Sequence, residues 1–172
     1  GNVATRTFTV DKTAPNIILR RNTTVIDGEG AYVSAFDTIS ALITDKNLAK
    51  IEFDGADTIV YSFEGSSLAD GTHTFTAYDL AGNVTVVSFI VHKAAPAFEL
   101  KEYYVSGEYI KLDLSEESID YVLLDNAITY QRSWYAASLG EGIHRIKAVD
   151  LARNETEKVF CVDTKNPTLE LM

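Results

Sequence analysis

The chain repeats itself, and an internal repeat constrains the fold of a chain more than any other sequence feature. The stretch from Gly71 to Asn83 aligns without a gap with the stretch from Gly142 to Asn154, at an offset of 71 residues, and Gly, His, Ala, Asp, Leu, Ala and Asn are identical at matching positions. The offset is kept in three later pairs, which are Phe89 and Phe160, Val91 and Val162, and Pro96 and Pro167. A chain of 172 residues is long enough for one medium domain or two small ones, and the repeat favours two.

A third copy of the end of this repeat opens the chain. At an offset of 81 residues, Gly1-Asn2 matches Gly82-Asn83, Phe8 matches Phe89, Val10 matches Val91 and Pro15 matches Pro96. The sequence therefore predicts four parts. Residues 1–12 are the terminal strand of a preceding repeat, residues 13–93 are repeat 1, residues 94–165 are repeat 2, and residues 166–172 are the start of a following repeat or a tail.

Each repeat has the pattern of antiparallel β-structure. His73, Phe75 and Ala77 alternate with threonines, which is the period of a half-buried strand, and residues 87–92 alternate in the same way. Asp54-Gly55 and Asp125-Asn126 predict hairpin turns, because these residues tolerate positive φ. Further strands are expected at residues 16–19, 38–44, 48–53, 58–63, 97–104, 109–114, 118–124 and 127–131. About seven short strands per repeat predict an all-β fold of two tandem immunoglobulin-like antiparallel β-sandwiches.

The charge and the cysteine count exclude several classes of protein. The formal net charge of -10, from 25 acidic and 15 basic residues, argues against nucleic acid as a partner. Cys161 is the only cysteine, so no intrachain disulfide or multi-cysteine zinc site can form. The longest apolar stretches have the length of strands, so no membrane insertion is expected in this segment.

The repeats resemble the bacterial immunoglobulin-like (Big) domains that occur in tandem on large surface and secreted proteins. That family ends its repeats with D-G-x-Y-x-x-x-A-x-D-x-A-G-N and opens the next with V-D-x-T-x-P; this chain has Asp70-Gly71 through Asn83, and Val10-Asp11-Lys12-Thr13-Ala14-Pro15. The resemblance covers both repeats. It implies an extracellular bacterial location, on the cell surface or secreted, with neighbouring repeats as partners. It also implies a structural stalk or spacer that presents another functional domain or contributes to adhesion.

The chain departs from the family pattern at three places. His73 and His144 replace the usual Tyr, His92 replaces the Asp of the junction, and Arg153 replaces the Gly of the A-G-N turn. At this last turn we expect Asn154 to adopt the left-handed conformation.

The aspartates of the repeated motif have a structural and a metal-binding interpretation. Asp79 with Gly82 and Asn83, and Asp150 with Asn154, predict structural turns, because an Asp side chain accepts backbone N–H groups two or three residues further on. The alternative is that they bind metal. Calcium between repeats, at Asp11 and Asp163, would need six to eight oxygen ligands, and His92 interrupts the pattern at the complete junction. We therefore expect no metal site and no cofactor.

The histidines do not predict catalysis. His73 and His144 lie on the inward face of a strand, where an imidazole can replace a Tyr hydroxyl in a tie to the neighbouring loop. No Ser or Cys nucleophile accompanies either in a recognisable motif. Glu116-Glu117 is interpreted as a solvated turn rather than a glycosidase pair. We expect no catalytic residues, and the protein is not expected to be an enzyme.

Four aromatic residues support the alternative function. Exposed on one side of a sandwich, Tyr103, Tyr104, Trp134 and Tyr135 would stack sugar rings. The chain would then be a carbohydrate- or host-protein-binding module, for example an accessory domain of a secreted glycan-active enzyme. The other interpretation is that Trp134 and at least one Tyr fill the core. Adjacent strand residues point to opposite faces, so one residue of each pair is expected to face solvent.

Two expectations concern exposed groups. Cys161 aligns with outward positions, which predicts a partly exposed free thiol, with a buried inert thiol as the alternative. The segment from Asn2 to Asp11 has the pattern of a strand without its sandwich. We expect this segment to be disordered, to pack on repeat 1, or to pair with another molecule.

Overall fold

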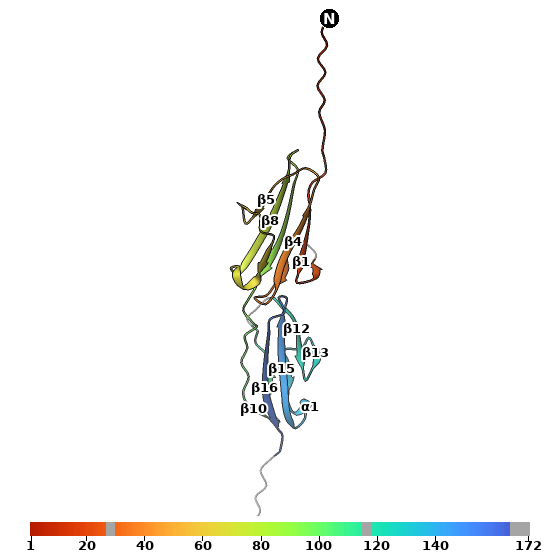
Figure 1. Ribbon diagram of the computed structural model, residues 1–172. Helices are drawn as coiled ribbons and strands as arrows, with labels where there is room; N and C mark the ends of the chain where they lie inside the picture. Colours follow the sequence, from red (N-terminus) through yellow and green to blue (C-terminus); the bar gives the residue numbers. More distant parts are fainter. Residues whose placement is uncertain (27–29, 115–117, 166–172) are drawn as a thin grey trace, which may run out of the picture. The chain divides into compact units, whose positions relative to one another are not determined.

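The computed structural model describes residues 1–26, 30–114 and 118–165, and its regular structure is nearly all β-strand. The chain divides into two compact units, unit 1 over residues 1–93 and unit 2 over residues 94–172 (Figure 1). The two helical elements are single turns, η1 (Gly65–Ser67) and α1 (Ala136–Leu139). Glu116, Glu117 and the expected start of a following repeat at residues 166–172 lie outside the described residues.

Unit 1 contains two sheets. The first has the strand order β2-β1-β4-β7 and the second the order β3-β9-β8-β5-β6. The strands are β1 (Asn16–Arg21), β2 (Thr24–Ile26), β3 (Ala31–Val33), β4 (Thr38–Thr44), β5 (Leu48–Phe53), β6 (Ala56–Asp57), β7 (Ser62–Glu64), β8 (Gly71–Asp79) and β9 (Val84–Val91).

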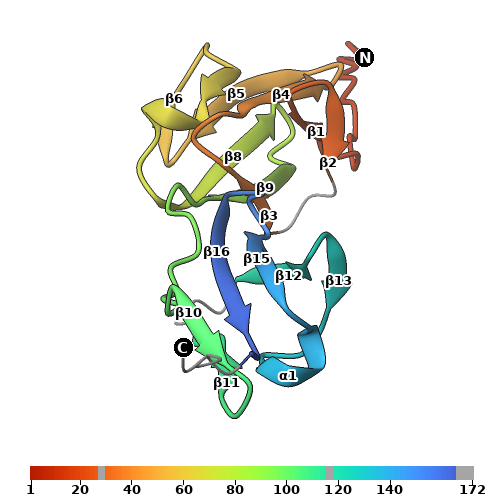
Figure 2. The same ribbon diagram turned by 90° about the horizontal axis from the view of Figure 1, so that it is seen from below.

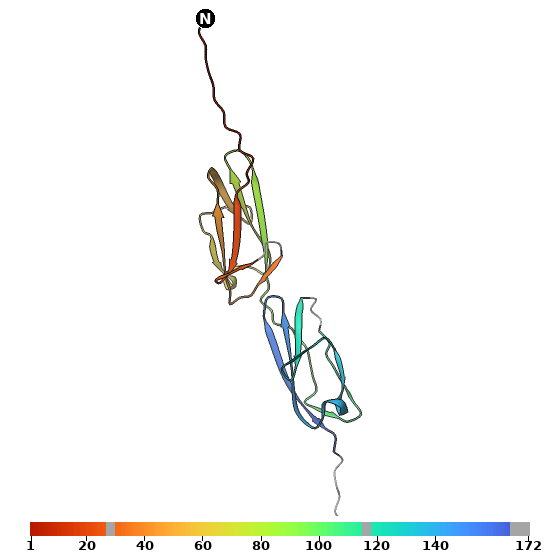
Figure 3. The same cartoon turned by 90° about the vertical axis from the view of Figure 1, so that its right-hand side faces the viewer.

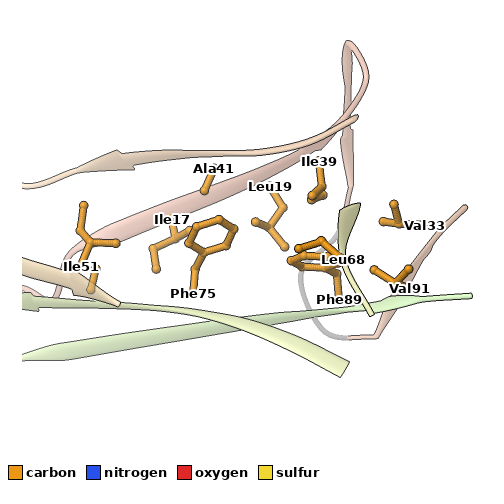
Figure 4. Packing of buried hydrophobic residues seen from close by; sticks show 11 residues of the cluster. Ile17, Leu19, Val33, Ile39, Ala41, Ile51, Leu68, Phe75, Phe89 and Val91 are labelled. Atoms are coloured by element: carbon orange, nitrogen blue, oxygen red, sulfur yellow. The ribbon is translucent and has the colours of Figure 1, made fainter. Parts of the chain in front are cut away.

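The core of unit 1 lies between these sheets. Ile17 and Leu19 of β1 and Ile39 of β4 point from the first sheet toward Phe75 of β8 and Phe89 of β9 in the second (Figure 4). Each strand contributes alternate residues, because successive side chains of a strand point to opposite faces. Figure 1 shows the two layers side by side, with β5 and β8 in one and β1 and β4 in the other, and Figure 3 shows the same unit turned by 90°.

Unit 2 repeats most of this arrangement with fewer strands. A five-stranded sheet has the order β10-β16-β15-β12-β13, and β11 and β14 form a second sheet (Figure 2). The strands are β10 (Tyr103–Val105), β11 (Tyr109–Lys111), β12 (Ile119–Leu124), β13 (Ala127–Thr129), β14 (Ser133–Tyr135), β15 (Gly142–Asp150) and β16 (Glu155–Asp163). Ile110, Trp134, Ile146 and Phe160 are among the buried residues of its core.

The sheets are consistent with immunoglobulin-like β-sandwiches, with one difference from the expected all-antiparallel pairing. β3 runs parallel to β9, and β10 runs parallel to β16, so each five-stranded sheet has a parallel pair at one edge. The other described strand pairs are antiparallel.

The sequence offset of 71 residues is also a structural offset. Ile51 pairs with Ala77 in unit 1, and Val122 pairs with Ala148 in unit 2. Even the irregularity near the start of β5, between Leu48 and Lys50, recurs in β12 between Ile119 and Tyr121. Equivalent residues of the two units therefore occupy equivalent places in the ladder.

The expected strands are found in part, since those predicted over 109–114 and 127–131 end early, at Lys111 and Thr129, and two others differ more. Strands β4 and β5 cover the predicted ranges 38–44 and 48–53. The prediction of a strand over residues 97–104 is wrong for most of its length, because β10 begins only at Tyr103. The predicted strand over 58–63 is reduced to β7, and the residues before it form a loop with exposed Ile59 and Val60.

Candidate functional site

A histidine ties the turn between β5 and β6 to strand β8. Asp54 and Gly55 occupy the turn with φ angles of 50° and 78°, the left-handed pair that a tight hairpin requires. The Asp54 carboxylate accepts a hydrogen bond from the Thr74 backbone N–H at 2.8 Å and lies 2.6 Å from His73 Nδ1, and His73 Nε2 lies 2.9 Å from the Ala69 carbonyl oxygen. We call this arrangement, with its counterpart in unit 2, the histidine clasp.

Unit 2 has the same clasp, built on Asp125 and His144. His144 Nδ1 lies 2.7 Å from the Asp125 carboxylate, and Nε2 lies 3.2 Å from the Gly140 carbonyl oxygen. Burial is the largest single influence on the pKa of Asp125 and raises it, but the hydrogen bonds from His144 and from the Arg145 backbone N–H together hold that pKa below its ordinary value. The expected tie between histidine and loop is thus present in both units.

The chemistry of the clasp is that of a structural contact. Each ring nitrogen of His73 and His144 lies within hydrogen-bond distance of a protein oxygen, one nitrogen near a carboxylate and the other near a backbone carbonyl. In this geometry both nitrogens are engaged by contacts within the unit. The His73 ring also stacks on Phe53 and Phe89, with ring centroids 5.6 Å apart in both contacts.

The turn after β8 is closed by an aspartate and an asparagine. The Asp79 carboxylate accepts hydrogen bonds from the Asn83 backbone N–H at 2.8 Å and from Asn83 Nδ2 at 2.7 Å, and Gly82 has a φ of 90°. The Asn83 side-chain bond is the main reason that the pKa of Asp79 lies below its ordinary value, although burial opposes it. Asn83 Nδ2 also donates to the carbonyls of Asp11 and Thr13 at 3.3 Å, so the turn holds the chain that enters unit 1.

The corresponding turn of unit 2 corrects one expectation. Asp150 accepts from the Asn154 backbone N–H at 2.7 Å and from Asn154 Nδ2 at 2.9 Å. The left-handed residue is Arg153, with a φ of 69°, and not Asn154. Arg153 occupies the position of Gly82, and the two bonds from Asn154 to Asp150 fix the residue from which β16 continues.

Metal ligands do not gather at the aspartates that we singled out. Asp11 accepts hydrogen bonds from the Thr13 backbone N–H and from Asn47 Nδ2, and Asp163 accepts one from the Lys165 backbone N–H. Among residues 1–26, 30–114 and 118–165, no group of three or more His, Cys, Asp or Glu side chains is arranged to hold a metal ion.

The four candidate aromatic residues do not form one surface. Tyr104 and Trp134 are buried in the core of unit 2, with 4% and 6% of their surface exposed, and Tyr104 meets Phe160 edge-to-face at 5.5 Å. Tyr103 and Tyr135 are exposed, but Tyr103 belongs to the five-stranded sheet and Tyr135 to the β11–β14 sheet. Each adjacent pair thus has one residue inside and one outside.

A tyrosine that the sequence analysis did not select is the neighbour of Tyr135. Tyr109 of β11 pairs directly with Tyr135 of β14, and their rings lie 5.2 Å apart, tilted by 50°. Both side chains are exposed on the outer face of this sheet, together with Lys111 and Ser133 at the next outward positions. An open hollow lies beside the β11–β14 sheet. Its lining includes Lys111, Ser133, Gln131 and Arg132. Period-two alternation in residues 109–111 predicts that Tyr109 faces solvent, but only the pairing of β11 with β14 places it beside Tyr135.

Unit 1 has a different surface cluster on β5 and β8. The Glu52 carboxylate accepts hydrogen bonds from Lys50 Nζ at 2.5 Å and from the Tyr78 hydroxyl at 2.9 Å, and Lys50 Nζ lies 4.5 Å from the centre of the Tyr78 ring. The hydrogen bond from Lys50 is the main reason that the pKa of Glu52 is below its ordinary value. The corresponding residues of unit 2 are Tyr121, Leu123 and Val149, so this cluster is not repeated.

Two further features concern the surface. Cys161 is a free thiol of intermediate burial on β16. No helix among the described residues has the length and hydrophobicity needed to cross a membrane.

Comparisons with known proteins assign no family. No protein-family model matches the chain, and a search of curated proteins finds no relative. Among solved structures, murine CEACAM1b is similar with 8% identity and a TM-score of 0.42, over 78% of this chain and 96% of that one. The Bacteroides ovatus mixed-linkage glucan utilization locus protein SGBP-B, solved with a mixed-linkage heptasaccharide, is similar with 10% identity and a TM-score of 0.33, over 89% of this chain and 61% of that one. Both TM-scores are below 0.5, so neither likeness assigns an activity or a ligand.

Proposed function

We propose that the two units are tandem immunoglobulin-like spacer repeats of a bacterial cell-surface or secreted protein, which present another functional domain or contribute to adhesion. The observation that carries the proposal is that contacts inside the units recur while surface clusters do not. The histidine clasp and the Asp–Asn turn appear in both units, whereas the Lys50 cluster and the tyrosine pair each appear in one. A spacer requires contacts that keep each unit folded and requires no shared binding surface.

The hydrophobic cores and the junction prolines of the units fit this role. Each unit has its own hydrophobic core, and sandwiches of this size gain further stability from neighbouring repeats in an array. In the sequence, Pro96 follows Val91 of β9 at the same spacing as Pro167 follows Val162 of β16, and proline fixes φ, which restricts the orientations of a junction. The partners of the units are therefore neighbouring repeats.

Small-angle X-ray scattering tests the spacer function. We compare the chain with variants in which one or two extra copies of residues 13–93 follow Lys93. A spacer array predicts that the maximum particle dimension grows by a constant increment with each copy. A dimension that stays nearly constant while the mass grows, as in a compact particle, would overturn the proposal.

The Tyr109–Tyr135 pair favours glycan binding by unit 2 as a second candidate function. Exposed aromatic rings stack on the apolar face of sugars, and adjacent polar groups can bind their hydroxyls. Lys111, Ser133, Gln131 and Arg132 supply such groups beside the pair. The two buried candidates, Tyr104 and Trp134, cannot take part without unfolding the core.

Affinity electrophoresis in gels that contain soluble polysaccharides tests this second function. Tyr109→Ala and Tyr135→Ala are each expected to remove at least about 80% of the retardation, because loss of a stacking ring costs about 1–3 kcal/mol. Tyr130→Ala is the control, since Tyr130 is 88% exposed and lies outside the pair. Equal retardation of all three variants and the parent would exclude the pair as a glycan site.

A further inference from the structure

Residues 1–10 have the side chains of a half-buried strand and bury none of them. Val3, Phe8 and Val10 are 90%, 87% and 66% exposed, and the segment forms no strand (Figure 1). Such exposure of large apolar side chains is unfavourable, since each gains free energy on burial. Phe8 and Val10 stand two positions apart, on one face of an extended segment, so this face is apolar and unpartnered, whereas Val3 stands on the other face.

The equivalent residues of both units show how such a face is buried. Phe8 and Val10 correspond to Phe89 and Val91 of β9, which are 0% and 1% exposed, and to Phe160 and Val162 of β16, which are 2% and 0% exposed. In each unit these strands lie between an antiparallel neighbour, β8 or β15, and a parallel neighbour, β3 or β10.

The other residues of the segment suit the same position. Thr5, Thr7 and Thr9 alternate with Arg6, Phe8 and Val10, and threonine is favoured in strands. Arg6 corresponds to Lys158 of β16, whose ammonium group reaches Glu99 at 2.7 Å while its chain remains in the sheet. A cationic side chain at this position is therefore compatible with a last strand.

Both ends of the segment carry the residues that bound a last strand, and the C-terminal end also carries the contact. Gly1-Asn2 corresponds to Gly82-Asn83, whose Asn closes the turn onto Asp79. At the other end, the Thr13 backbone N–H donates to Asp11 Oδ1 at 3.0 Å, as the Lys165 backbone N–H donates to Asp163 Oδ1 at 3.0 Å after β16. The turn that follows a last strand is thus already formed after residue 10.

We propose that residues 2–10 form the last strand of a further β-sandwich of the same repeat type, one that lacks a last strand of its own. The segment pairs there between an antiparallel strand equivalent to β8 and a parallel strand equivalent to β3, and it buries Phe8 and Val10. The units of this chain are not the partner, because β9 and β16 already occupy that position in each. The proposal rests on the spacer function and names the partner that such an array supplies to this segment.

The experiment supplies such a sandwich from the chain's own sequence. A copy of residues 13–81 is placed directly before Gly1, so that Asp79-Leu80-Ala81 of the copy continues into Gly1-Asn2 and recreates the turn. Amide hydrogen exchange of residues 3–10 is measured in this chimera and in the parent. We expect rapid exchange in the parent and exchange slower by roughly 100-fold or more in the chimera, because ladder amides open only with the unit.

Two controls make the result decisive. In the first, residues 13–91 precede Asp11 directly, so that the added copy keeps its own β9; protection of that strand shows that an added copy folds. In the second, Phe8→Asp is expected to leave the parent unchanged and to abolish protection in the chimera. The proposal is overturned if residues 3–10 stay unprotected in the chimera while β9 is protected in the first control. It is also overturned if the parent protects them in a concentration-dependent dimer. The scattering test does not involve these residues, so the two proposals can fail separately.

Discussion

At the scale of single residues, each unit depends on one histidine that joins a turn, a strand and a loop. His73 is 8% exposed, and both of its ring nitrogens are bonded, one to a carboxylate and one to a carbonyl. Hydrogen bonds to charged groups contribute more than neutral ones, and a buried partner left unpaired is costly. The clasp therefore contributes to the stability of unit 1 beyond the area that the imidazole buries.

His73→Ala is expected to lower the free energy of unfolding of unit 1 by about 2–3 kcal/mol, and Asp54→Ala by less, because Asp54 is partly exposed. A double-mutant cycle by chemical denaturation should give a coupling energy of about 1–2 kcal/mol. Thr72→Ala, an exposed change on the same strand, is the control. A coupling near zero would show that the two side chains act independently.

Acid should destabilise unit 1 through Asp79. The pKa of Asp79 is below its ordinary value in the folded state, so the ionised carboxylate stabilises the fold above about pH 4, and this contribution is lost as the pH falls through the folded-state pKa. Asp79→Asn removes the ionisation. The free energy of unfolding, measured between pH 2 and pH 6, should therefore fall less steeply in the variant than in the parent. Parallel curves would contradict the assignment.

The sequence predicts that one residue of an adjacent pair is buried and the other exposed, because side chains alternate between the two faces of a strand. The rule that adjacent strand residues face opposite sides correctly separates Tyr103 from Tyr104 and Trp134 from Tyr135. It does not state which exposed residues meet, because that depends on which strands pair. The contact of Tyr135 with Tyr109 is set by the β11–β14 register, which joins residues far apart in the sequence.

At the scale of elements, the loop between β3 and β4 is held by different residues from those that hold the equivalent loop of unit 2. In unit 1 the Asp37 carboxylate accepts from the Ser34 backbone N–H at 3.0 Å, and the Gly65 N–H donates to the Asp37 carbonyl at 2.7 Å. In unit 2 Glu108 and Ala136 take these positions, and the Val105 N–H donates to the Glu108 carboxylate at 3.1 Å. A Cβ on Gly65 would lie 2.0 Å from the Ser34 carbonyl oxygen.

Gly65→Ala is therefore expected to destabilise unit 1 by about 1–3 kcal/mol, because the backbone around Ser34 must move. Gly107→Ala is the control, since a Cβ there meets no atom within 4 Å. Thermal unfolding with hydrogen exchange distinguishes the units. If Gly65→Ala leaves the stability of unit 1 unchanged, this close approach is absent in solution.

Strands were predictable where the alternation of residues in the sequence agrees with the pairing of the strand with its neighbours, and not elsewhere. Strands β4 and β5 follow directly from alternation and from the Asp54-Gly55 turn. Residues 97–102 carry a similar pattern, and Phe98 is buried, but no strand forms there. The offset between the units falls from 81 residues at the prolines to 71 residues from β3 onward, so unit 2 lacks the stretch that contains β2. Without a counterpart of β2, residues 97–102 lack a neighbouring strand for backbone hydrogen bonds. The residue pattern of one strand does not reveal whether its neighbour is present.

At the scale of the whole molecule, each unit has its own buried core. Phe75→Ala removes a fully buried ring from unit 1 and is expected to lower the stability of that unit by about 3–5 kcal/mol. Amides of β8 and β9 should then exchange faster, while amides of β15 and β16 keep their rates. Ile146→Ala provides the matched change in unit 2. Equal acceleration in both units after Phe75→Ala would mean that they unfold as one.

The parallel pair of unit 2 has a consequence for a chain that is pulled at its ends. β10 is the first strand of this unit and β16 the last, and they run in the same direction over the register from Tyr103 and Cys161 to Val105 and Asp163. Tension along the polypeptide would draw the two strands past each other in opposite senses, so their hydrogen bonds would bear the load together as in shear. An antiparallel pair at this place would open like a zipper, one bond at a time. The orientation of a single short strand thus gives unit 2 mechanical resistance that its thermodynamic stability does not measure.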